Sequence, residues 1–386
     1  MIYLDSAATA MQKPAAVARA VEFALGHMAS PGRGGHRPAM LAGDTTFRCR
    51  REAAELFHVE SPENVVFTLN ATHALNLAIK SLVGPGDTVL ISGYEHNAVT
   101  RPLHAIPDVT VKVAAAPLFD QDALLGEFAR IMTPEVTAVV CTHVSNVFGY
   151  ILPIERIAAL CRQRGKRLIV DASQSAGTLA VHMDELGADF IAMPGHKGLY
   201  GPQGTGMLLC GCGDVRPLLE GGTGSASLRQ DMPEFLPDRL EAGTHNVTGI
   251  AGLLEGIRYV RRVGEERILA HERRLISLAA EGLRRQGRFA VFAGPAQAGV
   301  CSFVPRDMDC EALGEKLGEE GIAVRAGLHC APLAHRTAGT LDTGTVRLSV
   351  SAFNREEEIR QFLRAVRRGT KPPGRNCGRG KIDNNM

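Results

Sequence analysis

Short apolar segments alternate with helical segments between residues 60 and 210. Helices are predicted at 71–83 and at 153–164, where Pro153 opens the second helix and Gly165 ends it. Apolar runs without strict alternation indicate strands that are buried on both faces of a mostly parallel sheet. Such runs lie at 65–68, 88–92, 137–144, 167–171, 189–193 and 207–210.

A second pattern follows toward the carboxyl end. Helical periodicity extends over 250–285 with a break near Gly264, and a smaller mixture of strands and helices comes after it. We therefore expect an α/β fold with a large domain at 13–248 and a smaller α+β domain at 249–367. A short N-terminal segment, 1–12, precedes them. The segment 368–386 is polar and rich in Gly and Pro, so we expect a disordered tail. The strands of the smaller domain are predicted at 289–292, 300–304 and 346–351, and its helices at 309–319 and 355–367.

Composition and charge exclude several classes of protein. The 386 residues carry 43 basic and 41 acidic side chains, and a net charge of +2 gives no field for nucleic acid or an anionic membrane. No apolar run is long enough to span a membrane, and the N-terminus lacks the features of a secretory signal. Nine cysteines without disulfide-scaffold spacing indicate reduced thiols in a cytoplasmic protein. No metal site is expected, because the pair Cys210 and Cys212 has the wrong spacing for zinc.

Two polar residues follow predicted buried strands. Lys197 lies in a Gly-His-Lys-Gly turn after the strand at 189–193, where a desolvated amine can form a Schiff base. It could equally lie in solvent at the end of the strand. Asp171 ends the preceding strand, at the edge where open α/β sheets bind ligands. It could face the pyridinium nitrogen of pyridoxal phosphate, cap the next helix, or bind a metal.

Two loops add candidate chemistry. The turn from Asn70 to His73 precedes a predicted helix, and a helix N-terminus with a Thr hydroxyl can bind an anion, although simple capping gives the same pattern. Cys330 lies beside a His and near Arg325 in a loop that contains Gly and Pro. Electropositive surroundings favour the thiolate, whereas a buried structural cysteine is the alternative.

Nine motifs in register resemble the class V aminotransferases, which are fold-type I pyridoxal phosphate enzymes, and more closely the group II cysteine desulfurases and selenocysteine lyases. The resemblance covers almost the whole chain, to about residue 367. It implies a mostly parallel seven-stranded sheet in the large domain. The motifs are DSAAT, NATHALN, YEHNA, SNVFG, VDASQS, PGHKGLYGPQGTG, EAGTHN, RAGLHCAPL and VRLSVSAFN.

The resemblance implies a cofactor-binding role for eight residues. Lys197 matches the lysine that holds the cofactor covalently, Asp171 the partner of the ring nitrogen, and Gln174 the contact of the phenolic oxygen. The imidazole stacked on the ring, which also acts as an acid or base, is matched by His96. The phosphate contacts match Ala71, Thr72, His196 and Thr244, the last of which comes from the other subunit of a homodimer.

The resemblance also implies a reaction. Asn146 and Arg347 match the residues that hold the substrate carboxylate, with Arg325 at the mouth of the pocket, and Cys330 matches the sulfur-accepting nucleophile. We expect a cysteine desulfurase that converts L-cysteine to L-alanine, leaves a persulfide on Cys330, and passes the sulfur to a small acceptor protein or a reductant for Fe–S cluster or thiocofactor synthesis. A selenocysteine lyase acting on L-selenocysteine, or another lyase on this scaffold, is the alternative.

Three positions depart from the family pattern. Pro194 and Ala71 stand where hydroxyl residues are common, which makes the predicted phosphate site poorer in hydroxyl groups. His73 stands where an acid is common, and the sequence offers no reason for it.

Overall fold

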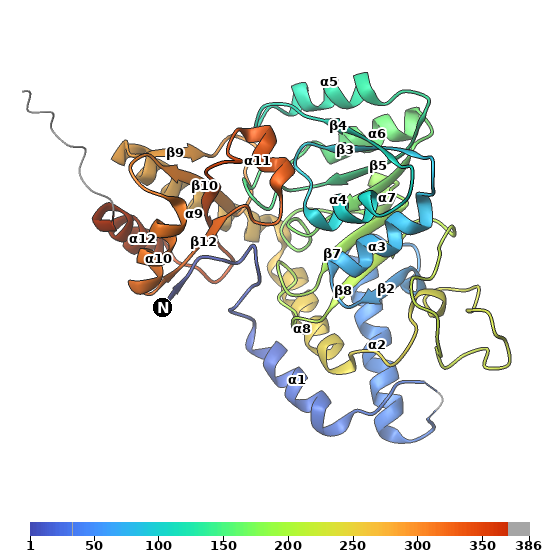
Figure 1. The fold of residues 1–386 in the computed structure, drawn as a ribbon. Coiled ribbons are helices and arrows are strands. Elements are labelled where there is room, and N and C mark those ends of the chain that lie inside the picture. Colours follow the sequence, from blue (N-terminus) through green and yellow to red (C-terminus); the bar gives the residue numbers. More distant parts are fainter. Residues whose placement is uncertain (33, 370–386) are drawn as a thin grey trace, which may run out of the picture.

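The computed structural model describes residues 1–32 and 34–369 (Figure 1). Its centre is a seven-stranded sheet in the order β2-β8-β7-β6-β5-β3-β4. Neighbouring strands pair in parallel from β7 to β4, whereas β8 is antiparallel to both of its neighbours. The expected α/β class with a large, mainly parallel sheet is therefore confirmed. The strands are β2 (Val65–Thr68), β3 (Thr88–Ser92), β4 (Thr110–Ala114), β5 (Val136–Thr142), β6 (Arg167–Asp171), β7 (Phe190–Pro194) and β8 (Gly206–Cys210).

The edge strand β4 was not predicted. Its sequence, TVKVA, places a lysine between two valines, and its first two residues are exposed. An edge strand of this kind lacks the continuous apolar run that identified the other six strands. The buried strands β2, β7 and β8 have no exposed residue, in agreement with their unbroken apolar sequences.

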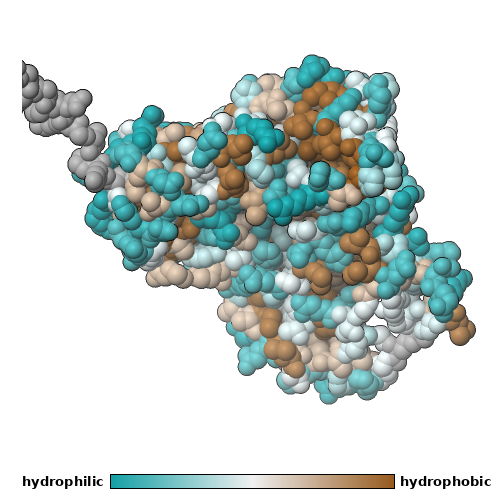
Figure 2. All heavy atoms as spheres, in the orientation of Figure 1, coloured by the Kyte–Doolittle hydropathy of each residue, from teal (hydrophilic) through white to brown (hydrophobic). Residues whose placement is uncertain are grey.

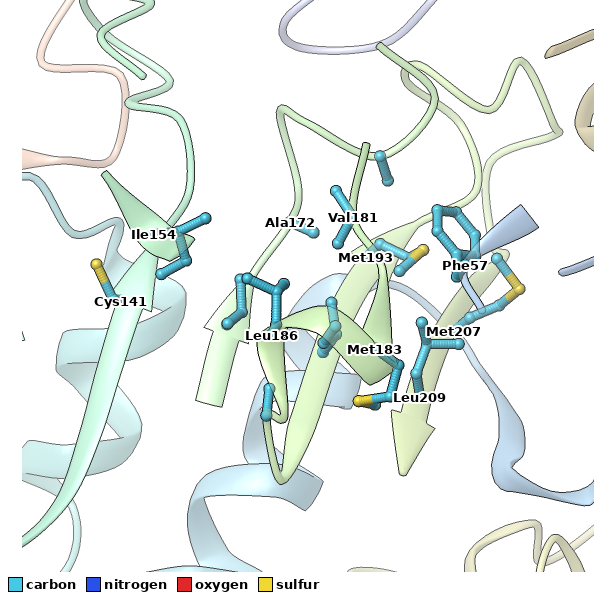
Figure 3. Close-up of a cluster of buried hydrophobic side chains, with 14 of the residues drawn as sticks. Phe57, Cys141, Ile154, Ala172, Val181, Met183, Leu186, Met193, Met207 and Leu209 are labelled. Carbon is cyan, nitrogen blue, oxygen red and sulfur yellow. The ribbon is translucent and has the colours of Figure 1, made fainter. Parts of the chain in front are cut away.

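Helices cover both faces of the large sheet, and each face has its own apolar core. On one face, α3 and α4 pack against the alternate side chains of the strands. The other face is covered by α2, α5, α6, α7 and α8, and Figure 3 shows part of this core, including Phe57, Met193 and Leu209. The helices are α1 (Ala15–His27), α2 (Arg37–Leu56), α3 (Ala71–Leu82), α4 (Asn97–His104), α5 (Gln121–Ile131), α6 (Ile154–Gln163), α7 (Met183–Leu186) and α8 (Val247–Val263), with the short 3₁₀ turns η1 (Pro62–Asn64) and η2 (Asp238–Leu240).

A smaller unit carries a four-stranded antiparallel sheet in the order β12-β13-β10-β9. A third apolar core joins this sheet to three helices. The chain crosses into it at Gly264, the predicted break, which lies between the end of α8 and the start of α9. Its elements are α9 (Glu265–Gln286), β9 (Phe289–Phe292), β10 (Val300–Pro305), α10 (Cys310–Glu319), β11 (Ile322–Ala323), β12 (Arg325–Gly327), α11 (Pro332–Ala338), β13 (Thr345–Ser349) and α12 (Glu356–Gly369).

Both ends of the chain contribute to the smaller unit. Strand β1 (Ile2–Tyr3) pairs in parallel with β11, which brings the N-terminal segment beside the carboxyl-terminal third of the chain. Helix α12 continues to Gly369, so the predicted tail at 368–386 begins two residues too early. The rest of it, 370–386, lies outside the described residues.

The surface is polar over most of the face drawn in Figure 2, with apolar patches between the polar side chains. Within the part of the chain that the structure describes, no helix is both long and apolar enough to span a membrane.

Candidate active site

A cavity opens at the carboxyl edge of β5, β6 and β7. The first turn of α3 and the start of α4 close its other side. The structure brings eight of the predicted residues together around this space, although they come from five separate stretches of sequence. They are Ala71, Thr72, His96, Asn146, Asp171, Gln174, His196 and Lys197.

Lys197 follows β7 in a turn whose neighbouring glycines are required by close packing. A Cβ on Gly198 would lie 2.4 Å from the Ala176 carbonyl oxygen, and one on Gly195 would lie 2.2 Å from Thr205 Oγ1. Burial lowers the pKa of Lys197 from 10.5 to about 8, and nearby arginine cations act in the same direction against the attraction of Asp171. The amine is therefore much closer to its free-base form at neutral pH than an ordinary lysine.

Asp171 and His96 flank the cavity. Asp171 ends β6, is 3% exposed, and accepts a hydrogen bond from the Ser173 amide at 2.9 Å. His96 is the N-cap of α4, and its Nδ1 accepts from the Ala98 amide at 3.0 Å. Burial lowers the pKa of His96. Because Nδ1 is an acceptor, the neutral ring carries its proton on Nε2.

The opposite end of the cavity is suited to an anion. Asn70 caps α3 by accepting from the His73 amide at 2.9 Å, while Ala71 and Thr72 of the first turn line the cavity. Nδ1 of His196 is buried and, among the described residues, has no hydrogen-bond partner. Burial lowers the pKa of His196 to about 4, so its imidazole is neutral.

Two of the departures from the family pattern can be placed here. His73 Nδ1 accepts from the Leu69 amide at 3.3 Å, which gives this histidine a local role in the turn before α3. Pro194 lines the cavity and offers no hydroxyl group. Gln174 also lines it, and its amide donates to the Ala7 carbonyl oxygen at 3.0 Å.

Arg347 lies just outside the cavity lining and contacts it through Asn146. Its guanidinium is 3% exposed, donates to the Asn146 carbonyl oxygen at 3.0 Å, and pairs with Asp5 at 2.8 Å. The other oxygen of Asp5 accepts from Arg325 at 2.9 Å, although half of the Arg325 side chain remains exposed. Sequence reasoning missed Asp5 as a partner of both arginines, although it lies in the DSAAT motif.

Glu95 is a second residue that sequence reasoning did not single out. Its carboxyl group is fully buried and accepts from the Ser92 hydroxyl and from the Thr142 amide at 2.9 Å. Burial raises the pKa of Glu95 to about 8. The residue joins the ends of β3 and β5 directly beside His96, and its only signal in the sequence is its place in the YEHNA motif.

Cys330 lies in the loop between β12 and α11. Among the eight cysteines that the structure describes, all are free and Cys330 is the exposed one. Burial raises the pKa of Cys161 and of Cys301 to about 12. Its carbonyl oxygen accepts from the Asn97 amide at 2.8 Å, so the loop is attached to the residue that follows His96. Its φ of 56° is left-handed, as is that of His329.

Thr244 lies elsewhere. It is exposed and lines a separate cavity together with Leu69, His73 and Glu241. Its predicted contact with a cofactor therefore depends on a second subunit and stays a prediction.

Comparison with known proteins identifies the family of this chain. The family model for class-V aminotransferases matches residues 2–362. A probable cysteine desulfurase of Xylella fastidiosa is 35% identical over 95% of this chain and 90% of its own length. The probable cysteine desulfurases of Mycolicibacterium paratuberculosis and Mycobacterium leprae are also 35% identical, and the chain spans 55% and 62% of their lengths.

Solved structures extend the likeness to three dimensions. The apo structure of a cysteine desulfurase from Thermococcus onnurineus has a TM-score of 0.87 at 30% identity, with 95% of this chain and 94% of that chain covered. The S-sulfonic acid form of the cysteine desulfurase CsdA from Escherichia coli has a TM-score of 0.83 at 26% identity over the same shares of both chains. The chain therefore belongs to the class-V aminotransferase family.

Proposed function

We propose that this protein is a pyridoxal phosphate-dependent cysteine desulfurase that converts L-cysteine to L-alanine and keeps the sulfur as a persulfide on Cys330. The observation that carries the proposal is the attachment of an exposed cysteine, through the 2.8 Å bond from Asn97, to the edge of a cavity that holds Lys197 and Asp171. The names of the similar proteins support the same activity.

The residues around the cavity fit pyridoxal phosphate. The first turn of α3 suits a phosphate group, as does Nδ1 of His196, which has no partner among the residues that the structure describes. The buried carboxylate of Asp171 suits a protonated ring nitrogen. Lys197 would hold the cofactor covalently, with the neutral ring of His96 beside it. When bound, the cofactor supplies an electron sink for negative charge that develops at the Cα atom of the substrate.

The chain's own groups perform the remaining steps. Arg347 and Asn146 bind the substrate carboxylate, with Arg325 at the entrance. The amine of Lys197 removes the Cα proton and returns it later, for which a pKa near 8 is well matched to neutral pH. Cys330 Sγ attacks the substrate sulfur. An S–S bond forms as the Cβ–S bond breaks, the electron pair stays on the carbon skeleton, and a proton taken up there completes alanine.

We also propose a homodimer, a sulfur acceptor and a cytoplasmic location. Thr244 is exposed and lines a different cavity of its own chain, which supports a homodimer in which it completes the partner's phosphate site. A small acceptor protein would take the sulfur for Fe–S cluster or thiocofactor synthesis. The free thiols of the described cysteines support a reducing, cytoplasmic location. L-Selenocysteine shares the carbon skeleton of L-cysteine, so a selenocysteine lyase is the second candidate.

The test compares two cysteine variants. The protein loaded with pyridoxal phosphate is given L-cysteine and a reductant, and alanine and sulfide are measured together. Equal amounts of both are expected; Cys330→Ala should release neither, whereas Cys212→Ala, which removes a half-buried thiol beside Arg167, should keep the activity. Alanine and sulfide from Cys330→Ala at the wild-type rate would contradict the proposal. A much faster reaction with L-selenocysteine that does not need Cys330 would favour the second candidate.

A further inference from the structure

The loop that presents Cys330 contains two consecutive residues in the left-handed region, His329 at φ 49° and Cys330 at φ 56°. Neither is glycine, and non-glycine residues keep this conformation only where their surroundings hold them in it. Two hydrogen bonds to backbone carbonyl oxygens hold the loop. The carbonyl oxygen of His329 accepts from Asn146 Nδ2 at 2.8 Å, and the carbonyl oxygen of Cys330 accepts from the Asn97 amide at 2.8 Å.

The side chain of His329 begins a buried chain of hydrogen bonds. Its Nε2 lies 3.0 Å from Thr345 Oγ1 and 3.2 Å from the Thr345 carbonyl oxygen. Thr345 Oγ1 lies 3.2 Å from Ser302 Oγ, which lies 2.6 Å from the carbonyl oxygen of Val147. Thr345, Ser302 and Val147 are fully buried. The chain crosses from β13 and β10 of the smaller unit to the segment that follows β5 in the large one.

The direction of every bond in this chain is fixed. The Val147 carbonyl can only accept, so the single hydroxyl proton of Ser302 is donated to it. Ser302 Oγ must then accept from Thr345, whose proton is thereby used. Both oxygens of Thr345 are left as acceptors, and His329 therefore carries its proton on Nε2. Nδ1 is buried and has no hydrogen-bond partner among the described residues.

His329 stays neutral. Burial lowers the pKa of its ring to about 2, and the nearby cations of Arg347 and Arg325 act in the same direction, as does the ring of His335, 5.7 Å away. A ring with this environment is a poor base, so its place next to the nucleophile does not indicate proton transfer.

We propose that His329 is a positioning residue whose Nε2–H, anchored through Thr345 and Ser302 to Val147, holds the Cys330 loop in its left-handed conformation. Val147 directly follows Asn146, so the anchor ends beside the residue proposed to bind the substrate carboxylate. The chain of hydrogen bonds therefore fixes the sulfur nucleophile relative to the bound substrate. The inference rests on the proposed function for its catalytic consequence but on the geometry alone for the loop conformation.

Two matched pairs of variants distinguish this positioning role from acid–base chemistry by the ring. Gln places its amide nitrogen near the position of Nε2, whereas Asn places it near that of Nδ1, so His329→Gln keeps the anchoring donor and His329→Asn loses it. Thr345→Ser keeps the hydroxyl, whereas Thr345→Val removes it at nearly constant volume. The first readout is hydrogen exchange, followed by mass spectrometry, at the amides of Asn97 and Ala331, which donate to carbonyls of this loop. The second is the rate at which sulfur appears on Cys330 in a single turnover with L-cysteine.

We expect exchange at these amides to accelerate by about 10-fold or more in His329→Asn and Thr345→Val, and to stay within about threefold in the conservative partners. The rate of sulfur transfer should fall by about 100-fold in the same two variants, because a small displacement of a reacting group has an effect of this size. The factor should be the same at every pH from about 6 to 9, since no proton transfer by the ring is involved.

Three results would overturn the inference. They are amide exchange that is unchanged in all four variants, sulfur transfer that slows equally in His329→Gln and His329→Asn, and a pH profile of sulfur transfer that loses its acidic or its basic limb. The last two would indicate acid–base chemistry by the ring. If wild-type protein gains no sulfur on Cys330, the proposed function fails, and the exchange measurement still decides whether the chain holds the loop.

Discussion

The lowered pKa of Lys197 predicts how fast the protein without cofactor captures pyridoxal phosphate at each pH. Only the free amine reacts with an aldehyde. With a pKa of about 8, about one tenth of Lys197 is free amine at pH 7. With the ordinary value of 10.5, only about one molecule in 3,000 would be, so the surroundings of Lys197 raise the reactive fraction about 300-fold. The capture rate should rise with pH, with a midpoint near pH 8.

The sign of the effect can be checked with two variants. Asp171 raises the pKa of Lys197 and Arg325 lowers it, so Asp171→Asn should move the midpoint to lower pH and Arg325→Gln to higher pH. The assay is stopped-flow absorbance near ~420 nm after mixing with pyridoxal phosphate. A midpoint near pH 10, or a shift of both variants in the same direction, would refute the reasoning.

The same pKa has a consequence for stability. The value for Lys197 is lower in the folded protein than in the unfolded chain, so between pH 8 and 10.5 the unfolded chain binds more protons. The free energy of unfolding of the protein without cofactor should therefore rise with pH in this window, by at most about 3 kcal/mol from this group. Urea unfolding at pH 8 and pH 10, compared with Lys197→Met, isolates this contribution.

Three further predictions follow from the site. Asp5→Asn leaves the buried guanidinium of Arg347 without its counter-charge and should lower the free energy of unfolding by about 3–5 kcal/mol, whereas Arg325→Gln, at an exposed position, should cost about 1 kcal/mol or less in urea unfolding. In Gly206→Ala the new Cβ would lie 2.7 Å from the Asn70 backbone, so the start of α3 must move; fluorescence titration should show weaker binding of pyridoxal phosphate, and unchanged affinity would contradict the phosphate site. Iodoacetamide applied to the native protein should modify Cys330 first among the eight described cysteines, and peptide mass spectrometry that finds a buried one modified first would contradict its exposure.

The sequence was sufficient for those parts of the fold whose residues are buried on both sides. Strand β7 is an unbroken apolar run, and β6 has three apolar residues between Arg167 and Asp171. The helix boundary at Gly264 follows from a residue that leaves the helical conformation at φ 91°. Edge strand β4 was not predicted because its side chains are only half buried and include Lys112. The strands β1, β11 and β12 have two or three residues each, too few to show a period.

The site could also be predicted only in part from the sequence. Lys197 and Asp171 could be recognised because Asp171 ends one strand that is evident in the sequence and Lys197 lies in the turn after another, so the sheet places both at one edge. Asp5 could not, because its partner Arg347 lies 342 positions away, and the N-terminal segment reaches that place through the pairing of β1 with β11 and the bridge between Asp5 and Ser349. Long-range pairings of this kind leave no periodic pattern in the sequence.

Arg347 shows how these long-range contacts shape the chemistry. Its terminal nitrogens already donate to the Asn146 carbonyl oxygen and to Asp5, while its Nε is buried and has no partner among the described residues. A guanidinium has five N–H donors, so a substrate carboxylate can use Nε or the second N–H of a terminal nitrogen, including the nitrogen that pairs with Asp5. A carboxylate on the nitrogen that pairs with Asp5 competes with Asp5 for the charge of the guanidinium. That ion pair, together with backbone bonds such as the one from the Ser349 amide to the Leu4 carbonyl oxygen, holds the N-terminal segment against β13. For this reason, we expect binding at the proposed substrate site to affect how firmly the N-terminal segment is held. The strength of carboxylate binding is limited by the same ion pair that keeps the buried guanidinium in place.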